Sequence, residues 1–210
     1  MPEGPDIRWT SDRSLRVEGM PSPGAAQALR DVAGVIDVVP TLEAMHVLVD
    51  PLADVSPEAL RVRLADRRLA RSTKPGTHEI PVCYEPPYAP DLDEVASITG
   101  MTPQSVIELH SDTSFTVGFM GFAPGFGYLI GLPERLHVSR LASPRTWLEA
   151  GSVGIAGSYS GVYANAGPGG WRVIGKTAAR LFDPRREPAA LLRTGDVVRF
   201  KPVSKREFEA

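Results

Sequence analysis

The sequence predicts two parts, a small α+β layer followed by a mainly-β body that is a closed or nearly closed barrel. Helical and β-type patterns alternate in the first third of the chain, whereas short β-type runs dominate from Phe115 onward. The 20 glycines and 20 prolines are spread between these runs rather than gathered in one tract. Such spacing indicates many tight turns, as a β-rich body requires.

Four β-type runs and two helical patterns make up the first part. The runs are Ile7–Trp9, Leu15–Val17, Val35–Pro40 and Met45–Asp50, the last two forming a predicted hairpin around Thr41–Ala44.

The first helical pattern covers Pro23–Ala33, with Gly34 as its stop. The second begins at the predicted N-cap Ser56, followed by Pro57 at the first helical position. Its apolar face consists of Leu60, Leu64 and Leu69.

The polar connector Arg71–Thr77 is the predicted boundary, so we expect domains at residues 1–77 and 78–210. The second domain is predicted to open with a strand at His78–Tyr84 and two short helices at Asp91–Ile98 and Thr102–Ser111. The later β-type runs are Phe115–Met120, Gly151–Ala156, Arg172–Gly175 and Val197–Pro202.

The composition excludes several classes of protein. A formal net charge of −2 gives no reason to expect nucleic acid or an anionic membrane as a partner. The single cysteine, Cys83, can form neither an internal disulfide nor a thiolate metal cluster, and we expect it to be buried. The start MPEGPDIRWT does not resemble a signal peptide, and no apolar run is long enough to span a membrane. We therefore expect a cytoplasmic protein.

The stretch GWRVIGKT, residues 170–177, matches the phosphate-loop pattern G-x-x-x-x-G-K-[ST]. A phosphate loop curls so that consecutive N–H groups face the phosphate. Trp171, Val173 and Ile174 favour an extended chain instead, because bulky and β-branched side chains fit a pleated strand. We predict a strand here, preceded by a turn at Asn165–Gly170, and a chance match to the loop pattern.

The segment Phe119–Pro133 is rich in both glycine and aromatic residues. Glycine permits sharp turns and close approach of a ligand, and aromatic rings supply the flat walls of a pocket. The candidate substrate-binding residues in this segment are Phe122, Pro124, Gly125 and Tyr128. The alternative is that these residues form barrel corners with core aromatics.

Arg145 is the candidate anchor for a carboxylate or carbamate, because a guanidinium binds two oxygens at once. A surface salt bridge is the alternative for this residue. Tyr163 and Ser152 are candidates to offer hydroxyl groups to the same pocket.

None of the four histidines shares metal-ligand spacing with another, so we expect no metal site. His110 follows the apparent helix Thr102–Leu109 and is the candidate proton-transfer group. A helix-terminal cap is the alternative reading.

Several motifs follow one another within residues 81–203, namely PGFGYLIGLPERL, SPR, AGSVGIAG, GVY, PGGWRVIGKT, LFDP and LLRTGDVVRF. In this order they resemble the allophanate hydrolase subunit 1 family, which includes the 5-oxoprolinase B subunit and a sporulation-kinase inhibitor of bacilli. The resemblance implies a ferredoxin-like α+β domain followed by a cyclophilin-like β-barrel, a carboxyltransferase-like domain.

The resemblance also implies a hydrolase subunit that works with a homologous second subunit, and in some systems with a third. The second subunit would be of the same type as allophanate hydrolase subunit 2 or the 5-oxoprolinase C subunit. The complex would consume ATP to act on a small amide or lactam; the resemblance does not assign ATP binding to this chain. The alternative role is a regulator that binds and inhibits a histidine kinase.

The catalytic candidates chosen from the residues themselves are His110, Arg145 and Tyr163. The substrate-binding candidates in and around the motifs AGSVGIAG, GVY and PGGW are Ser152, Tyr159, Gly169, Gly170 and Trp171, with Tyr159 lying between the first two motifs. The chain departs from the family pattern at Ser158, at Tyr159, where the family usually has glutamine, and at Ala164, where it usually has proline.

Overall fold

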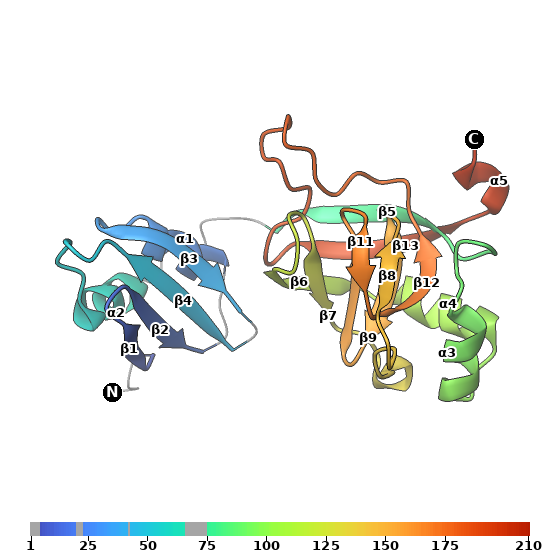
Figure 1. Cartoon of the computed structure of the whole chain (residues 1–210), viewed down its shortest axis with the longest axis horizontal. Coiled ribbons are helices and arrows are strands. Elements are labelled where there is room, and N and C mark those ends of the chain that lie inside the picture. Colours follow the sequence, from blue (N-terminus) through green and yellow to red (C-terminus); the bar gives the residue numbers. More distant parts are fainter. Residues whose placement is uncertain (1–4, 20–22, 42, 66–74) are drawn as a thin grey trace. The chain divides into compact units, whose positions relative to one another are not determined.

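The computed structural model describes residues 5–19, 23–41, 43–65 and 75–210, which form two compact units, residues 1–75 and 76–210 (Figure 1). Leu69 and most of the predicted connector Arg71–Thr77 lie outside the described residues. The assignment of residues 1–77 and 78–210 to two named domain types stays a prediction. Within the described ranges, no helix combines the length and apolar character needed to cross a membrane.

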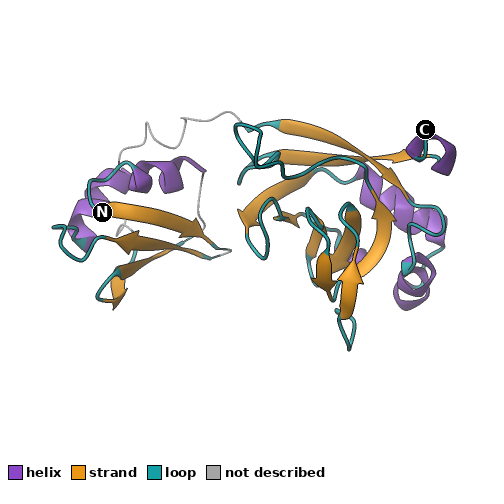
Figure 2. Cartoon of the chain, turned by 45° about the horizontal axis from the view of Figure 1, so that its top comes forward, coloured by secondary structure: helices purple, strands orange, loops and turns teal. Residues whose placement is uncertain are grey.

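The first unit is an antiparallel sheet in the order β1-β2-β4-β3. Its strands are β1 (Ile7–Ser11), β2 (Ser14–Glu18), β3 (Val35–Pro40) and β4 (Ala44–Val49). The helices α1 (Pro23–Arg30) and α2 (Pro57–Ala65) lie against one face of the sheet (Figure 2). The core between sheet and helices includes Leu15, Val17, Leu29, Val47 and Leu60, all of which are buried.

The start of helix α2 follows the predicted capping. The Ser56 hydroxyl oxygen accepts the Ala59 N–H at 3.1 Å, and Pro57 is the first residue of α2. The predicted end of the first helix at Ala33 is wrong, because α1 ends at Arg30. After that residue the chain tightens: the Val32 amide donates to the Leu29 carbonyl, three residues back, at 3.1 Å.

The element order of the first unit is β-β-α-β-β-α, whereas a ferredoxin-like domain reads β-α-β-β-α-β. The run from β2 to α2 reproduces the first five ferredoxin-like elements. The edge position beside β2 is occupied by β1, which precedes β2 in the chain. The ferredoxin-like description therefore stays a prediction.

The second unit contains a closed barrel in the order β10-β7-β6-β13-β5-β12-β9, which confirms the predicted barrel. Its strands are β5 (Thr77–Cys83), β6 (Phe115–Met120), β7 (Gly127–Ile130), β9 (Ser152–Ala156), β10 (Tyr159–Val162), β12 (Arg172–Lys176) and β13 (Val197–Val203). The first and last of these, β5 and β13, pair in parallel over seven residues and bring the two ends of the unit together.

Three α-helices, a short 3₁₀-helix and a small sheet accompany the barrel. These are α3 (Leu92–Thr99), α4 (Pro103–Asp112), α5 (Lys205–Phe208), η2 (Glu134–Leu136) and the pair β8 (Arg145–Leu148) with β11 (Gly167–Gly169). The Thr102 hydroxyl caps α4 by accepting the Ser105 N–H at 3.1 Å, and Pro103 follows it as predicted.

The stretch GWRVIGKT is extended: it enters strand β12, whose Arg172–Lys176 pair with β9 and, at Lys176, with β5. The prediction of a strand is confirmed. The predicted turn at Asn165–Gly170 is wrong in part, because Gly167–Gly169 pairs with β8.

Four strands were not predicted from the sequence, namely β7, β8, β10 and β11. They are only three or four residues long, and most contain glycine or proline, which are depleted in strands on average. Pairing with neighbours far along the chain overrides that local preference.

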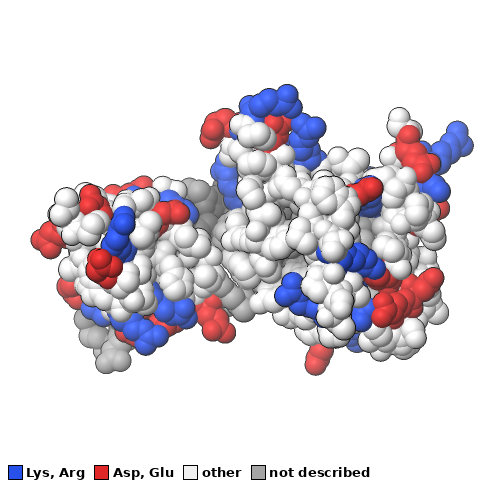
Figure 3. All heavy atoms as spheres, viewed as in Figure 1, with Lys and Arg blue, Asp and Glu red and all other residues white. Residues whose placement is uncertain are grey.

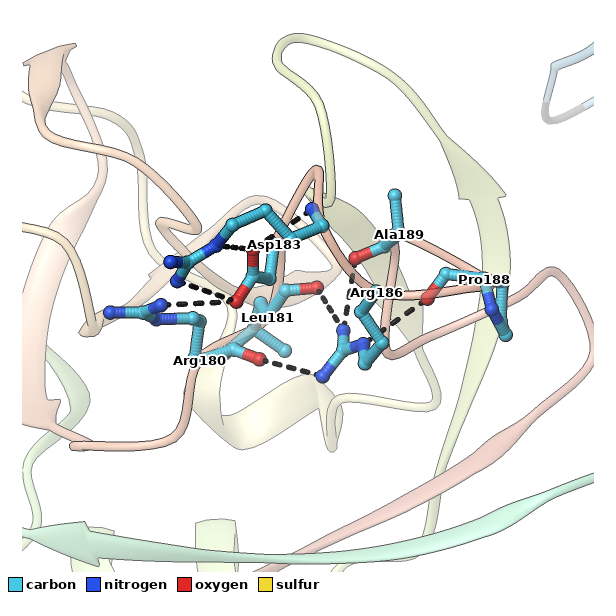
Figure 4. A network of polar contacts seen from close by, with 7 residues as sticks. Arg180, Leu181, Asp183, Arg186, Pro188 and Ala189 are labelled. Carbon is cyan, nitrogen blue, oxygen red and sulfur yellow. Dashed lines mark hydrogen bonds and ion pairs between the residues drawn. The ribbon is translucent and has the colours of Figure 1, made fainter.

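A projecting loop between residues 180 and 190 is held by arginines. The Arg186 guanidinium donates to the carbonyls of Pro188 at 3.1 Å and Ala189 at 3.0 Å, and more weakly to Leu181 at 3.4 Å (Figure 4). Asp183 accepts from the side chain and amide of Arg185 and from Arg180, which lowers the pKa of its carboxyl to about 2. The arginines of this loop therefore serve its own conformation.

Candidate functional site

Seven aromatic rings form a continuous cluster in the second unit. Phe126 lies at its centre, with ring centroids 5.1 Å from Tyr128, 5.4 Å from Trp171 and 5.5 Å from Tyr163. The other members are Phe119, Phe122 and Tyr159. Most contacts are edge-to-face, the arrangement that ring quadrupoles favour. We call these seven residues the aromatic cluster.

The aromatic cluster covers the outer face of the barrel wall. Side chains alternate between the faces of a strand, so Leu129 and Ile174 point into the main core while their neighbours Tyr128 and Val173 point outward. Leu148 of β8 packs over the same outer face. The cluster is thus separated from the barrel interior by one layer of backbone.

Glycines in the strands make room for the rings. A Cβ at Gly161 would lie 3.0 Å from Cζ of Phe126 and 3.1 Å from Cζ3 of Trp171, and one at Gly154 would lie 3.2 Å from Cβ of Trp171. These distances are shorter than ordinary van der Waals contact. Gly154 and Gly161 therefore leave space on the strands for the rings of the aromatic cluster, because they carry no side chain.

Phe122 is the exposed member of the aromatic cluster. Its side chain is 60% exposed, and its φ of +66° lies in the left-handed region, which costs a residue with a side chain about 1–3 kcal/mol. Its ring contacts Phe126 and Tyr163 at centroid distances of 5.3 and 5.9 Å. The strain holds an apolar ring at the surface, where burial offers little compensation.

The predicted residues Pro124 and Gly125 hold the Phe122 loop in place. Asn165 donates its side-chain N–H to the Pro124 carbonyl at 2.8 Å. A Cβ at Gly125, where φ is +81°, would lie 2.6 Å from Cβ of Phe182. These contacts fix the loop against the neighbouring 165 and 182 segments.

Tyr163 lies beneath the turn formed by Gly169 and Gly170. Its hydroxyl oxygen accepts the Trp171 N–H at 3.4 Å and would lie 2.5 Å from a Cβ at Gly169, so only glycine fits there. Burial raises the pKa of the Tyr163 phenol, although the Trp171 amide and the charges of Arg140 and Arg145 oppose that shift. Tyr163 is therefore a neutral phenol near pH 7.

Arg145 is held by a buried partner that the sequence analysis did not identify. Its two terminal nitrogens donate to the Asp91 carboxylate at 2.9 and 2.6 Å, and this hydrogen bonding raises the pKa of Arg145. Asp91 also accepts the Val173 N–H at 2.6 Å and is 4% exposed. The contact between Arg145 and Asp91 is the salt bridge given as the alternative for Arg145, except that Asp91 is buried and not at the surface.

Arg140 was missed by the sequence analysis. Its Nε would lie 3.7 Å from a Cβ at Gly170. Gly170 follows Gly169, which lies over the Tyr163 hydroxyl. The residue is exposed, and no hydrogen bond or ion pair holds its guanidinium in the part of the chain that the structure describes. The only sequence signal was its spacing, five residues before Arg145 in SRLASPR.

His110 is not near the aromatic cluster's outer face. It lies within α4, fully buried, and stacks on Phe200 at a centroid distance of 4.7 Å. The Tyr84 hydroxyl is 2.8 Å from Nδ1, and Nε2 is 2.8 Å from the Ser160 hydroxyl, which donates to the Gly154 carbonyl at 3.4 Å. Burial lowers the pKa of His110 to about 3, so the imidazole is neutral.

The His110 network is internally complete. Tyr84 donates to Nδ1, Nε2–H donates to Ser160, and Ser160 donates to a backbone carbonyl, so each polar atom has a partner. Burial also raises the pKa of Tyr84. A helix-terminal cap is therefore the wrong reading of His110, because its ring points inward from the last turn of the helix.

The remaining predicted residues have local partners. Ser152 donates its hydroxyl to the Glu149 carbonyl at 2.8 Å, and Tyr159 packs on Tyr128 at 5.7 Å. Lys176, the lysine of the phosphate-loop match, contacts the Glu149 carboxylate and lies over the Tyr88 ring at 5.6 Å. Hydrogen bonding with Lys176 lowers the pKa of Glu149.

An open groove of about 310 Å³ lies at another place on the second unit. Its lining shares no residue with the aromatic cluster; it consists of Tyr84, Glu85, Gln104, Ile107, Glu108, Ser111, Pro202, Val203 and Ser204. Within the described ranges, no three His, Cys, Asp or Glu side chains gather as a metal site would require.

Charged side chains of both signs are interspersed over the face in view, with an uncharged surface over the middle of the barrel unit (Figure 3). Of the twelve predicted site residues, eight fall into two groups. Phe122, Tyr128, Tyr159, Tyr163, Gly169, Gly170 and Trp171 gather on the outer face of the barrel. His110 lies in the interior.

Comparison with known proteins places the chain in a family. Residues 22–192 match the model of the carboxyltransferase domain, subdomain C and D. The 5-oxoprolinase B subunit of Escherichia coli O157:H7 is 42% identical over 184 residues, covering 84% of this chain and 82% of that protein. That of Bacillus subtilis strain 168 is 48% identical over 132 residues, covering 63% of this chain but 55% of the relative.

Solved structures agree with the fold. A conserved uncharacterized protein of Pyrococcus horikoshii is 35% identical with a TM-score of 0.62, covering 97% of this chain and all of the other. The urea amidolyase of K. lactis is 19% identical with a TM-score of 0.70, covering 98% of this chain and 15% of that one, and shows the fold alone. The chain therefore belongs to the carboxyltransferase-domain family of the 5-oxoprolinase B subunit and the allophanate hydrolase subunits.

Proposed function

We propose that this chain is a subunit of an ATP-dependent complex of the 5-oxoprolinase or allophanate hydrolase type. It acts on a small amide or lactam and works together with a homologous second subunit. The observation that carries the proposal is the match to a 5-oxoprolinase B subunit at 42% identity over most of both chains. The relatives' designation as a subunit supports a complex of several chains.

The outer face of the barrel is the proposed half-site for the substrate. Phe122 offers an exposed flat ring, which suits the planar amide group of a lactam. Arg140, whose guanidinium has no hydrogen-bond or ion-pair partner among the described residues, lies at the Gly169–Gly170 turn. Tyr163 holds that turn from below through the Trp171 amide.

The face is open rather than enclosed, which supports completion by a second chain. Opening a lactam to an amino acid consumes water, so the site has to admit the reacting water while keeping bulk solvent from the reacting centre, and a ring that is 60% exposed cannot do so alone. We place the partner subunit over Phe122 and the adjoining turn. His110 has no part in this half-site, because a buried neutral imidazole cannot exchange protons with a substrate outside the barrel.

The proposal assigns ATP to the complex and not to the GWRVIGKT strand. Lys176 is engaged by Glu149 and Tyr88, and the strand presents no curled backbone to a phosphate. We expect Lys176→Ala to leave the nucleotide affinity of the complex unchanged. A loss of affinity would return the phosphate loop to consideration.

We further propose that the first unit is a variant of the ferredoxin-like fold, that the barrel is cyclophilin-like, and that the protein works in the cytoplasm. The sheet order, with β1 at the edge beside β2, supports the first of these.

The test is reconstitution with candidate partner subunits. The purified chain is mixed with them, and the formation of glutamate from 5-oxoproline is measured together with ADP release. We expect ATP-dependent ring opening that requires this chain. Absence of activity with every partner set, including a Tyr159→Gln variant, would contradict the proposal, and recovery of a histidine kinase alone in a pull-down would favour the regulator.

A further inference from the structure

Three arginines surround the turn that covers Tyr163, and their partners differ. Arg145 forms a two-pronged ion pair with Asp91, at 2.9 and 2.6 Å. Arg172 contacts the Glu94 carboxylate and donates Nε–H to the Ser139 carbonyl at 3.1 Å. Each of these guanidinium groups already has an acidic partner.

Arg140 has no acidic partner within the described ranges. Its Nε lies over Gly170, at 3.7 Å from the position of a Cβ there. The three guanidinium groups carry three positive charges, and Asp91 and Glu94 supply two negative ones. One positive charge is left at the edge of the aromatic cluster, and it belongs to Arg140.

The backbone on both sides of Arg140 is fixed. The Val138 carbonyl accepts the Gly157 N–H at 2.7 Å, and the Leu141 amide donates to the Gly170 carbonyl at 2.8 Å. The Ser139 carbonyl accepts from Arg172. A binding residue on a fixed backbone loses less conformational entropy when its ligand arrives.

We propose that Arg140 is the residue that binds the carboxylate of the substrate, and that Arg145 has a structural role through Asp91. The reaction itself rests on the function proposed above. A guanidinium pairs two N–H groups with two carboxylate oxygens, and the exposed part of the aromatic cluster receives the rest of a small molecule. The ligand class is a small monocarboxylate with a planar amide, such as 5-oxoproline.

The test compares an anionic and an uncharged probe by ligand-observed NMR. The probes are 5-oxoproline and the same lactam with its carboxylate converted to a carboxamide, with acetate as a minimal anion. They are titrated against the chain together with its partner subunit where a complex forms, and against the chain alone otherwise. The variants are Arg140→Ala, Arg140→Lys and, as a matched loss of charge on β13, Arg199→Ala.

We expect Arg140→Ala to raise the Kd of 5-oxoproline by about tenfold or more, since a charge-assisted pair of hydrogen bonds is lost. Arg140→Lys should recover part of the affinity, because it keeps the charge without the two-pronged geometry. The carboxamide probe should bind the wild type and Arg140→Ala equally. Arg199→Ala should bind every probe as the wild type does, and the Tm of Arg140→Ala should be unchanged.

The proposal is overturned if Arg140→Ala binds 5-oxoproline as the wild type does, if it loses both lactam probes equally, or if the wild type binds no carboxylate. These outcomes are separate from failure of the proposed function. If no partner set opens 5-oxoproline but Arg140→Ala still loses carboxylate binding, the reaction assignment fails and the role of Arg140 stands.

Discussion

Polar and aromatic residues gather at two places in the barrel unit, one in the barrel interior and one on its outer face. The two groups differ in how many of their polar atoms have hydrogen-bond or ion-pair partners. In the interior, His110 has hydrogen-bond partners on both ring nitrogens and rings packed around it. On the outer face, Phe122 is exposed and Arg140 is unpaired in the described part of the chain.

The presence or absence of such partners distinguishes residues that stabilise the fold from residues that can bind a ligand. A buried polar network with every partner in place contributes to stability and has nothing left to offer a ligand. A strained exposed ring costs stability, and both this ring and a guanidinium without a partner among the described residues are free to bind a ligand. Residue type alone favoured His110 as the functional group, whereas the hydrogen bonds and ion pairs in the structure favour Arg140.

The largest expected effect concerns the interior. His110→Ala should lower the free energy of unfolding by about 4 kcal/mol, because it leaves a cavity and removes the partners of Tyr84 and Ser160. Urea unfolding measures this loss. The matched variant Ser160→Ala should cost less, since it removes two hydrogen bonds but little volume. A variant that kept its stability but lost turnover would move His110 into the catalytic group.

The next effect concerns the ion pair between Asp91 and Arg145. Arg145→Ala should cost about 3 kcal/mol, because it leaves the Asp91 carboxylate buried with only the Val173 amide as partner. A double-mutant cycle with Asp91→Ala should show strong coupling in chemical unfolding. If Arg145→Ala unfolded like the wild type and instead lost substrate affinity, the roles assigned to the two arginines would be reversed.

The glycines of the barrel wall give a third test. Gly161→Ala should cost about 2 kcal/mol, because the new Cβ would press on Phe126 and Trp171 from 3.0 and 3.1 Å. Gly167→Ala is the control, as a Cβ there meets no atom within 4 Å. Thermal unfolding of the two variants should therefore differ. Equal Tm values would show that the aromatic cluster is loosely packed.

The pH dependence of stability tests whether His110 is buried as a neutral imidazole. The pKa of His110 is lowered to about 3 in the folded chain, against about 6.5 when unfolded. Between these values the unfolded chain binds more protons, so stability should fall as pH falls, by at most about 1.4 kcal/mol per pH unit. Unfolding at pH 6.5 and 5 measures the slope, and a His110→Gln variant removes this contribution. An identical slope in both would contradict a buried neutral histidine.

The smallest effect on stability is expected at Phe122. Phe122→Gly relieves the left-handed backbone but loses the contacts with Phe126 and Tyr163, so the free energy of unfolding should change by less than about 1 kcal/mol. Activity of the reconstituted complex should nevertheless fall. Full activity in a stable Phe122→Gly protein would show that the exposed ring has no part in the site.

The sequence predicted the barrel and the strand at GWRVIGKT, because β-branched residues and Gly/Pro turns are local signals that the fold respects. It did not predict strands such as Gly127–Ile130 and Gly167–Gly169, whose composition argues against strands and whose pairing depends on distant segments. Local propensity cannot report such long-range contacts.

The candidate site was predicted in part. The motif residues Phe122, Tyr163 and Trp171 do meet, although their roles stay predictions. Arg145 was singled out over Arg140 because no local pattern reveals that Asp91, 54 residues away, already binds it. Which arginine lacks an acidic partner depends on tertiary contacts, and these cannot be predicted from the spacing of residues in the sequence.

The most direct test of the central claim is a chemical-shift map of the ¹⁵N-labelled chain, in its complex where one forms, during titration with 5-oxoproline. The account predicts that the largest shifts occur at the amides of Gly169, Gly170 and Trp171 and at Nε of Arg140, while His110 is unaffected. Shifts confined to the groove beside Tyr84 and Gln104, or to His110, would contradict it.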